Sequence, residues 1–529
     1  MSVIDFIIVV VYLGALLVVG ARLSKGNVTQ DDYFIAGRSM AWLPVALSVA
    51  ATTISGNGLI GGPGWSYQSG LRAFMQNASI PLVLALACSC FLPFLYHIRI
   101  TSCYEYLQKR FGAVSRTLGA VGFLMTALIQ VSSMVYIPSL IISQLTGWDI
   151  KLVLVIIVIV STVYTLLGGI KAVIWTDVIQ MVIVWGGLFA IVFLAFKNLD
   201  ISFMDTIQTA REAGKLNALD FSANPKVENG FWVTLLGGGI MWMQYYISDQ
   251  SQVQRLFSTK SVTEVKRSLL TSGILMNVMY FLFMIIGLIM FSVFQGKTFE
   301  NTNQVMIQFI AEKIPTGVMG CIIAGIFAAA MSSVDSLLNS MATVFIKDIY
   351  EKWVLKGRRA VSMGVSRYFT LAMAGLAVLF ATFGFMNTTA SVLAVVGSYI
   401  SYLCGAILGM FLLGMLTRKA NDFGVSIGFV AGVLGTVAIA RVYPVNYLWY
   451  NVTGLAITMV AGYLASLVKP CRSTEDIEAY TLLGCRREIR MRGKDQKGLL
   501  QEMPCRMDKY TWGLIIFFVI QYIVLGILK

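Results

Sequence analysis

ATTISGNGLIGGPG, residues 51–64, decides the fold, because it interrupts an apolar run that is long enough to cross a membrane. The stretch holds five glycines, one proline and four side chains that end in a hydroxyl or an amide. Backbone is irregular at membrane depth only where protein buries it or where it lines a wet cavity. Such an interruption predicts a transporter binding site, where free carbonyls hold a cation and a half-helix N-terminus holds an anion. Close packing of two intact helices through small residues is the alternative.

The composition is that of a protein that crosses the membrane several times. Of the 529 residues, 57% are hydrophobic and 12% are charged, and the mean hydropathy is +0.77. Soluble proteins carry about 25% charged residues. We attribute the net charge of +14 to cytoplasmic loops rather than to nucleic-acid binding. The cysteines show no zinc-like spacing, and the single histidine, His97, argues against a histidine-based metal site.

Apolar runs of spanning length predict about fourteen membrane helices. The first run lacks an early positive charge and a cleavage site, so it is interpreted as a helix and not as a signal peptide. The expected spans are 3–21, 43–69, 74–96, 117–146, 151–168, 174–196, 230–249, 269–294, 316–346, 366–385, 389–416, 422–440, 446–467 and 510–528.

The basic residues orient these helices. With the N-terminus outside, about three-quarters of the lysines and arginines, Arg255 among them, fall in cytoplasmic segments, as the positive-inside rule requires. We therefore expect both termini outside the plasma (inner) membrane and no lysine or arginine in the membrane interior. The outer loop 197–229 should be partly ordered. The inner loop 469–509 is strongly basic, as expected for a segment that lies near anionic lipid.

A second glycine-rich stretch, LLGGG at residues 235–239, follows the first one five helices later. Interrupted helices at corresponding positions of two halves are typical of transporters built from inverted repeats. We therefore expect a second broken helix at this position.

Two aspartates fall inside predicted membrane helices, Asp177 near the start of one and Asp335 in the middle of another. Ionisable groups at this depth are costly, so each is a candidate functional group. One face of the second helix carries four polar side chains at helical spacing: Ser332, Asp335, Ser336 and Asn339. Carboxylate, hydroxyl and carbonyl oxygens are the ligands of hard cations. Hydrogen bonding between helices is the alternative role of the serines.

Over nearly its whole length the chain resembles the sodium/solute symporter family. Two stretches, VYIPSLIISQLTGWD (135–149) and DQSQVQR (249–255), look most similar to the branch that carries monocarboxylates, iodide and vitamins, and to bacterial sialic acid symporters. Six stretches carry the resemblance in family order: DDYFIAGRSM (31–40), ATTISGNGLIGGPG (51–64), ITSCYEYLQKRF (100–111), LLGGIKAVIWTDVIQ (166–180), QSQVQRLFSTKS (250–261) and AAAMSSVDSLLNSMATVFIKDIY (328–350).

The resemblance implies an all-α membrane protein with a leucine-transporter-like fold and alternating access driven by sodium. Two inverted five-helix repeats would form its core, at residues 43–196 and 230–416. The remaining segments would be a first helix and cytoplasmic loop (1–42), the outer loop (197–229), accessory helices (417–468), the basic cytoplasmic loop (469–509) and a last helix (510–529).

The resemblance also implies two cation sites. The main sodium site would use the backbone carbonyls of Ala51, Ile54 and Ala329 with the hydroxyls of Ser332 and Ser333. A second site, present in some family members, maps to Asp177, Ser332, Asp335 and Ser336.

Asp335 departs from the family pattern, in which a serine is expected at this position. Two carboxylates near one site repel each other unless a cation lies between them. We therefore expect Asp335 either to strengthen a second sodium site or to bind a proton.

The substrate is expected between the broken helices, near Thr52, Thr53, Ser55, Asn57, Gln76, Asn77, Gln130, Trp242 and Tyr245. Polar residues of the family's galactose transporters are replaced here by Gly58, Trp242 and Met276, and Gln130 stands where sialic acid symporters have an arginine. Helix N-termini and hydroxyls would suit a small organic anion of the monocarboxylate, vitamin or sialate type. A neutral sugar, polyol or amino acid, coupled to sodium or to protons, fits the same groups.

Other classes of protein fit the sequence less well. Channels usually build rings of carbonyls or charges by subunit symmetry. An intramembrane enzyme would need a nucleophile with a base, or a metal cluster, and a sensor would signal through the loop 469–509. The expected partners are a small-molecule substrate, co-transported sodium and the lipid bilayer, without an organic cofactor or nucleic acid. The sequence carries no signal for an oligomeric state.

Overall fold

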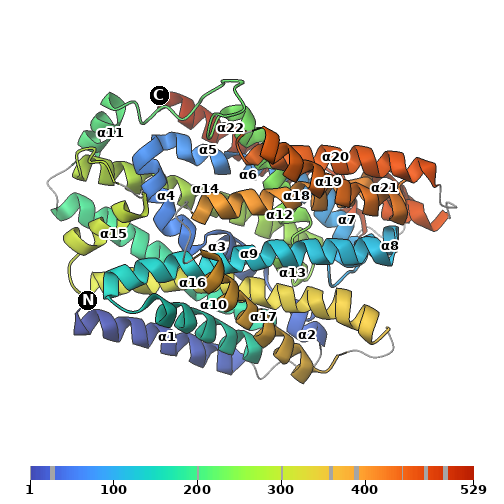
Figure 1. The fold of residues 1–529 in the computed structure, drawn as a ribbon, viewed down its shortest axis with the longest axis horizontal. Helices are drawn as coiled ribbons and strands as arrows, with labels where there is room; N and C mark the ends of the chain where they lie inside the picture. Colours follow the sequence, from blue (N-terminus) through green and yellow to red (C-terminus); the bar gives the residue numbers. More distant parts are fainter. Residues whose placement is uncertain are drawn as a thin grey trace.

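The computed structural model describes residues 2–23, 30–198, 202–299, 302–356, 361–385, 392–443, 445–469, 475–492 and 499–528. Most of its helices run side by side along the longest axis of the molecule (Figure 1). Within the described ranges the chain forms no extended strand, only one isolated bridge between Met40 and Thr259. The predicted all-α architecture is confirmed.

Twenty of the twenty-two α-helices in the described ranges make up most of the fold. In chain order they are α1 (Val3–Leu23), α3 (Trp42–Thr53), α4 (Gly56–Ser69), α6 (Ile80–Leu86), α7 (Leu92–His97), α8 (Tyr104–Arg110), α9 (Ala113–Thr146), α10 (Ile150–Asn198), α11 (Phe203–Glu212), α12 (Gly239–Ile247), α13 (Gln250–Phe257), α14 (Val262–Val293), α15 (Thr302–Lys313), α16 (Val318–Val344), α17 (Met363–Phe385), α18 (Val392–Leu416), α19 (Asp422–Val442), α20 (Leu448–Val468), α21 (Leu482–Arg492) and α22 (Lys509–Ile527).

Further helical segments, most of them short, complete the described chain. They are α2 (Gln30–Ile35), η2 (Ala36–Arg38), η3 (Gly70–Phe74), α5 (Met75–Ala78), η4 (Ala87–Phe91), η5 (Val233–Gly238), η6 (Phe345–Val354), η7 (Glu475–Tyr480) and η8 (Leu499–Glu502).

The described helices agree with the predicted membrane spans. Eleven stretches of the described helices are long and apolar enough to cross a membrane. Ten of them each match one expected span, and the eleventh, Gly58–His97, runs from the second half of the span 43–69 through the span 74–96. The other three expected spans are also helical: the interrupted helix of α3 and α4, the short helix Ile150–Leu166, and the helix of η5 and α12. Helix α1 begins and α22 ends toward the same end of the bundle (Figure 1).

The first expected interruption is present, between α3 and α4. Ile54 (φ −89°, ψ 85°) ends α3, and Ser55 (φ −79°, ψ 166°) precedes α4. A Cβ on Gly56 would lie 2.6 Å from Pro138 Cγ, so a glycine lets the start of α4 pack directly against α9. The small residues of this stretch therefore serve both the break and the close packing.

The second expected interruption is wrong in its position. Residues 235–238 lie in η5, a π-helical segment that continues without a break into α12 at Gly239. The glycines serve packing instead, since a Cβ on Gly237 would lie 2.5 Å from the carbonyl oxygen of Leu448 on α20. The helix ends later, at Ser248 and Asp249, and the Asp249 side chain then caps α13 by accepting a hydrogen bond from Ser251 N at 2.8 Å.

Two expected spans, 151–168 and 174–196, join in α10 across a sharp kink at Gly169. Gly169 has φ +58°, and a Cβ there would lie 2.7 Å from the carbonyl oxygen of Tyr33. A positive φ together with this close approach requires glycine. The second half of α10 brings Asp177 toward the centre of the molecule.

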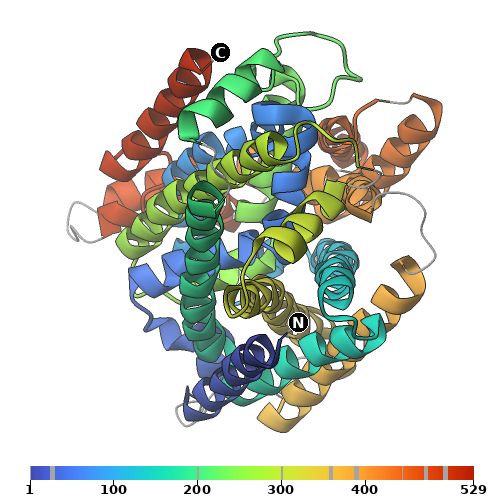
Figure 2. The same cartoon turned by 90° about the vertical axis from the view of Figure 1, so that its left-hand side faces the viewer.

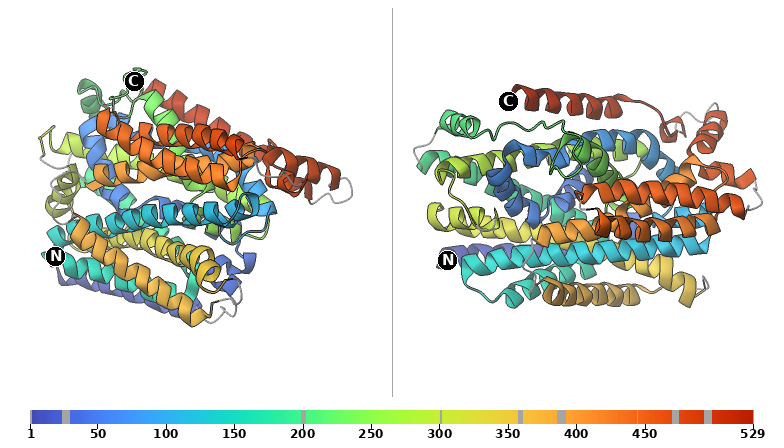
Figure 3. Two further views of the ribbon diagram at one scale, coloured as in Figure 1. Left: turned by 45° about the vertical axis from the view of Figure 1, so that its right-hand side comes forward. Right: turned by 45° about the horizontal axis from the view of Figure 1, so that its top comes forward.

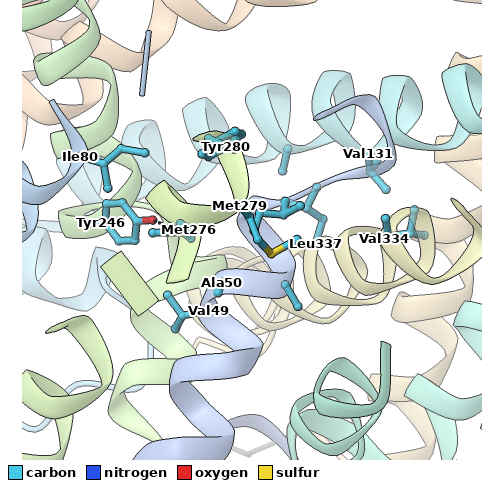
Figure 4. Packing of buried hydrophobic residues seen from close by; sticks show 14 of the residues in the cluster. Val49, Ala50, Ile80, Val131, Tyr246, Met276, Met279, Tyr280, Val334 and Leu337 are labelled. Atoms are coloured by element: carbon cyan, nitrogen blue, oxygen red, sulfur yellow. Dashed lines mark hydrogen bonds between the residues drawn. The ribbon is translucent and has the colours of Figure 1, made fainter. Parts of the chain in front are cut away.

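Helix α16 lies in the core, and its residues from Ile322 to Val344 are buried. It contacts α1, α3, α4, α9, α10, α13 and α17. Figure 2, which looks along the helices, shows it enclosed by its neighbours. Side chains of α3, α12, α14 and α16 converge at the packed centre in Figure 4, where Val49, Tyr246, Met276 and Leu337 are labelled.

The two long loops are partly helical. The loop 197–229 contains α11, which begins with a capping box between Ser202 and Asp205, and this confirms the expected partial order. The loop 469–509 contains η7, α21 and η8 in its described part. Helices α18, α19 and α20 pack against one another on one flank of the bundle (Figure 3).

Candidate functional site

An uncharged oxygen cluster lies where α16 passes the break between α3 and α4. Ser332 Oγ is 3.3 Å from the carbonyl oxygen of Ala51 and 3.2 Å from that of Ala329. Ser333 Oγ is 3.2 Å from the carbonyl oxygen of Thr52 and 3.4 Å from that of Ala329. We call Ala51, Thr52, Ala329, Ser332 and Ser333 the neutral cluster. It brings together four of the five residues expected to hold sodium.

The fifth expected ligand, Ile54, is buried at the break itself. Ser333 contacts the carbonyl of Thr52 rather than that of Ile54. The sequence places Thr52 only among the substrate residues. In the structure its hydroxyl also lies near the residues expected to bind a cation, because Thr52 Oγ1 is 3.1 Å from Ser336 Oγ.

A charged cluster lies beside the neutral one and is fully buried. Ser48 Oγ donates to Asp177 Oδ2 at 2.5 Å, and Arg255 Nε donates to Ser48 Oγ at 2.8 Å. Arg255 Nη2 is 3.6 Å from Asp177 Oδ2 and also contacts Ser336 Oγ. Asp177 and Arg255 are both 0% exposed. A buried ion pair therefore connects α10 with α13.

Asp335 joins this cluster from α16. Tyr164 Oη donates to Asp335 Oδ2 at 2.7 Å, and Ser336 Oγ is 3.1 Å from Asp335 Oδ1. Gln180 Nε2 is 3.4 Å from Tyr164 Oη. We call Asp177, Arg255, Asp335 and Ser336 the charged cluster. With Ser332 one turn away, the structure brings together all four residues expected at the second cation site.

The sequence does not predict the burial of Arg255, whose side chain reaches Asp177 in the membrane span Gly168–Lys197. All eight residues of α13 are buried, and Arg255 lies against Asp177. The polar stretch 250–255 has the composition of a loop, but its side chains turn inward because a buried carboxylate needs a partner. That need is the signal that could identify Arg255, whereas nothing in the sequence points to Ser48 or Tyr164.

Some predicted substrate residues surround an aromatic group near the break. Thr53 Oγ1 is 3.4 Å from Tyr246 Oη, and Tyr280 Oη donates to the carbonyl oxygen of Thr53 at 3.3 Å. Tyr246 Oη is 3.2 Å from Met276 Sδ. Tyr245 packs edge-to-face on Tyr246, with ring centroids 5.4 Å apart. Thr53 and Tyr245 thus lie around the same buried site, and Tyr246 and Tyr280 belong to it as well.

Other predicted substrate residues form a second group next to it. Trp242 Nε1 donates to the carbonyl oxygen of Gln76 at 3.1 Å, and Gln76 Nε2 donates to Tyr447 Oη at 2.9 Å. Trp242 also packs on Tyr245, with centroids 5.7 Å apart. Trp242 therefore connects Gln76 to the aromatic group.

The remaining predicted substrate residues are placed less closely together. Ser55 and Asn77 are buried, and Gln130 is half-buried on α9. The side chain of Asn57 lies outside the described part of the structure. The first bonds of α4 run from the N–H groups of Gly58 and Leu59 to Ser55 O, so the preceding N–H groups face the break.

These features define a membrane transporter in which an interrupted helix faces a serine-rich helix. The chain belongs to the sodium:solute symporter family, because the sequence model of this family matches residues 33–432. It is 27% identical to the sodium/sialic acid symporter NanT of Aliivibrio fischeri, over 90% of this chain and 95% of that protein. It is 30% identical to the mouse sodium-coupled monocarboxylate transporter 1, over 82% of this chain and 74% of that protein.

Solved structures agree with this assignment. The structure of a Na⁺-coupled sialic acid symporter in a substrate-bound outward-open state matches 89% of this chain and 100% of that protein, with a TM-score of 0.82 at 28% identity. The nucleobase-cation-symport transporter Mhp1 in a closed conformation shares the fold, with a TM-score of 0.59 at 14% identity. The chain is therefore a sodium-coupled symporter that crosses the membrane several times, and not an enzyme. The family resemblance and the leucine-transporter-like fold are confirmed.

Proposed function

We propose that this symporter carries a small organic anion together with sodium. The observation that supports this most directly is the break at Ile54 and Ser55. The carbonyls that end α3 and the N–H groups that begin α4 lie within one turn of each other. One side of the break suits a cation and the other suits an anion.

Sodium binding at the neutral cluster provides the coupling in this proposal. The ligands are the carbonyls of Ala51 and Ala329 and the hydroxyls of Ser332 and Ser333 in this cluster, together with the carbonyl of Ile54 at the adjoining break. The carbonyls belong to α3 and α16, so an ion between them would hold these two helices together. Asp177, Ser332, Asp335 and Ser336 form the second cation site.

The substrate binds on the other side of the break, against the aromatic group. Its polar contacts come from backbone N–H groups, hydroxyls and amides, because no predicted contact residue is basic. These residues are Thr52, Thr53, Ser55, Asn57, Gln76, Asn77, Gln130, Trp242 and Tyr245. Sialic acid and monocarboxylates, which the similar symporters are named for, are organic anions.

A neutral sugar, polyol or amino acid is the second candidate substrate. The amides of Gln76, Asn77 and Gln130 favour it, since they donate and accept hydrogen bonds without adding charge. A neutral solute would leave the coupling at the neutral cluster unchanged.

The placement in the membrane is part of the proposal. The N-terminus and the C-terminus face the outside of the plasma (inner) membrane, and the basic loop 469–509 faces the cytoplasm. Residues 43–196 and 230–416 form the two inverted repeats of the core. Helix α1 begins and α22 ends toward one end of the bundle, which supports a common side for the termini.

Uptake into proteoliposomes tests the function directly. An inward sodium gradient is combined with labelled acetate, pyruvate, pantothenate, sialic acid, proline, galactose or myo-inositol. Sodium-dependent accumulation of one of the anions supports the proposal. Accumulation of a neutral compound alone selects the second candidate, and accumulation that follows a proton gradient alone overturns sodium coupling. The Ser332→Ala variant is the control for coupling through the neutral cluster.

A further inference from the structure

Two cysteines from distant parts of the sequence meet where the loop 469–509 lies against the helix bundle. Cys90 belongs to η4, the π-helical segment between α6 and α7, and Cys505 follows η8 near the end of the loop. Both are free thiols, and both residues are half-buried, so each keeps part of its surface accessible. The proposed sodium and substrate sites include neither of them.

Backbone contacts bring the two cysteines together. Cys505 N donates to the carbonyl oxygen of Ser89 at 2.8 Å, so the backbone of Cys505 lies directly beside the residue that precedes Cys90. The Cys505 thiol forms a hydrogen bond with the Cys90 side chain, and this bond raises the pKa of Cys505 above its usual value. A disulfide needs two closely spaced backbones whose side chains face each other. These contacts provide both conditions before any covalent bond joins the sulfurs.

A positive charge lies beside the pair. Arg486 Nη1, on α21, donates to the carbonyl oxygen of Cys505 at 3.0 Å, which places a guanidinium next to the two thiols. A neighbouring arginine favours the thiolate, the nucleophilic form of a cysteine. The backbone of Cys505 is also strained, with φ +57°, a conformation that residues other than glycine rarely adopt. Charge and strain of this kind are typical of functional positions.

Ion pairs on both sides of Cys505 hold the end of the loop in place. His97 Nδ1 is 2.7 Å from Glu502 Oε2, three residues before Cys505. Lys266 Nζ is 2.6 Å from Asp508 Oδ2, three residues after it. The segment that carries Cys505 is therefore attached to α7 and to α14, and the cysteine stays close to its partner without a covalent bond.

We propose that Cys90 and Cys505 form a redox-modification site, which a small disulfide such as oxidised glutathione converts into an intramolecular disulfide. The Cys90 thiolate attacks one sulfur of the small molecule, whose S–S bond breaks and releases one thiolate. The Cys505 sulfur, having lost its proton, then attacks Cys90 in the mixed disulfide and displaces the second thiolate. Two protein thiols are oxidised, the small disulfide is reduced to two thiols, and the two protons pass to those thiols.

The new bond joins the loop 469–509 covalently to the span 74–96. The segment η4 in this span contacts α12, α14 and α22, so the bond lies among helices from distant parts of the chain. A reducing compartment keeps both thiols free, and the bond forms when oxidised disulfides accumulate. Because a cross-link between distant residues restricts the unfolded chain, we expect the oxidised protein to be the more stable form.

Thiol exchange with the purified full-length protein tests the proposal without any substrate. The protein in detergent is equilibrated with mixtures of reduced and oxidised glutathione, free thiols are blocked with N-ethylmaleimide, and the peptides are mapped by mass spectrometry. We expect a Cys90–Cys505 disulfide that a reductant removes, whereas the exposed Cys321 on α16 carries glutathione instead. Free thiols at both positions, or glutathione on each of them without a bond between them, would overturn the proposal.

Substitution of one cysteine separates the pair from the other thiols. In Cys505→Ser the reaction should stop at the mixed disulfide on Cys90, because no second sulfur displaces glutathione. Oxidation should raise the midpoint of thermal unfolding of the wild type by several degrees and leave that of Cys505→Ser unchanged. Cys485→Ser, which removes a buried thiol of α21 in the same loop, is the matched control and should keep the shift. A shift of equal size in Cys505→Ser would assign the effect to other cysteines and contradict the proposal.

Discussion

The neutral and charged clusters lie side by side along α16 but differ in the charge of their groups. The neutral cluster consists of carbonyls and hydroxyls around the helix break. The charged cluster consists of two carboxylates, a guanidinium and one hydroxyl, carried by α10, α13 and α16. The neutral cluster offers oxygen ligands but contains no positive charge. The charged cluster already contains a positive charge, the guanidinium of Arg255.

This difference indicates which cluster can respond to sodium. Uncharged carbonyl and hydroxyl oxygens bind and release an ion at modest cost, as a transport cycle requires. A buried ion pair loses much of its stability if one partner is removed, because the other charge is left uncompensated. We therefore expect substitutions in the charged cluster to reduce stability most, and substitutions in the neutral cluster to change sodium affinity most.

The largest effect is expected for Asp177→Ala. Removing one partner of a buried pair costs about 3–5 kcal/mol, and here it leaves Arg255 without its ion-pair partner. The midpoint of thermal unfolding of the purified protein should fall clearly. Glu312→Gln on α15, an exposed side chain that accepts from Gln308, is the control and should leave the midpoint unchanged. Equal midpoints for wild type and Asp177→Ala would contradict the structural importance of the pair.

Ser333→Ala should have the next largest effect, and on a different quantity. Hydrogen bonds to a charged group contribute about 1.5–3 kcal/mol, which corresponds to a rise of about ten- to 150-fold in the sodium concentration for half-maximal uptake. Thermal stability should change little, because an alanine fits in the space of the serine. Ser139→Ala on α9, whose hydroxyl bonds only to its own helix at Val135, is the matched control. If the sodium concentration for half-maximal uptake stayed the same, Ser333 would not take part in sodium coupling.

The contrast between the clusters also explains what the sequence could predict. Glycines and small polar residues inside an apolar run are a local pattern, so the break at Ile54 and Ser55 could be placed within residues 51–64. Asp335 and its serines share one helix, so their common face followed from spacing alone. Both features depend on residues that are close in the sequence.

Arg255 and the second glycine-rich stretch needed the tertiary structure. Arg255 is separated from Asp177 by 78 positions, and only the packing of α13 against α3 and α16 turns it inward. Gly237 has the sequence context of a helix breaker, but its neighbour Leu448 on α20 makes it a packing residue. Composition alone does not distinguish a glycine that breaks a helix from one that admits another helix.

Gly56→Ala tests whether the break depends on close packing. The added methyl group would lie 2.6 Å from Pro138 Cγ, and overpacking of this kind costs about 1–3 kcal/mol. We expect a lower unfolding midpoint and a weaker sodium response, since the carbonyls of the neutral cluster shift with α3. Gly58→Ala is the matched control, because its Cβ would only reach ordinary contact with Phe283 and Tyr280 at 3.8–3.9 Å. A Gly56→Ala protein as stable as Gly58→Ala would show that the break tolerates a side chain.

The smallest effect is expected at a partly exposed ion pair that contrasts with the buried one. Lys266 Nζ is 2.6 Å from Asp508 Oδ2, at the base of α22. Burial alone would raise the pKa of the Asp508 carboxyl, but hydrogen bonds from Lys266 and Thr511 outweigh it, and the pKa lies below its usual value. A lowered pKa means that the folded protein holds the ionised form more strongly than the unfolded chain does.

The stabilisation from Asp508 is therefore fully present above the unfolded pKa of about 3.9 and is lost as the pH falls through the lower folded value. Unfolding midpoints of wild type and Asp508→Asn should differ slightly at pH 7, by the equivalent of about 1 kcal/mol or less, and converge in strongly acidic solution. A difference as large as that of Asp177→Ala would show that exposure to water does not separate these two ion pairs. A small difference between the two midpoints would indicate that the Asp177–Arg255 pair owes its larger contribution to complete burial.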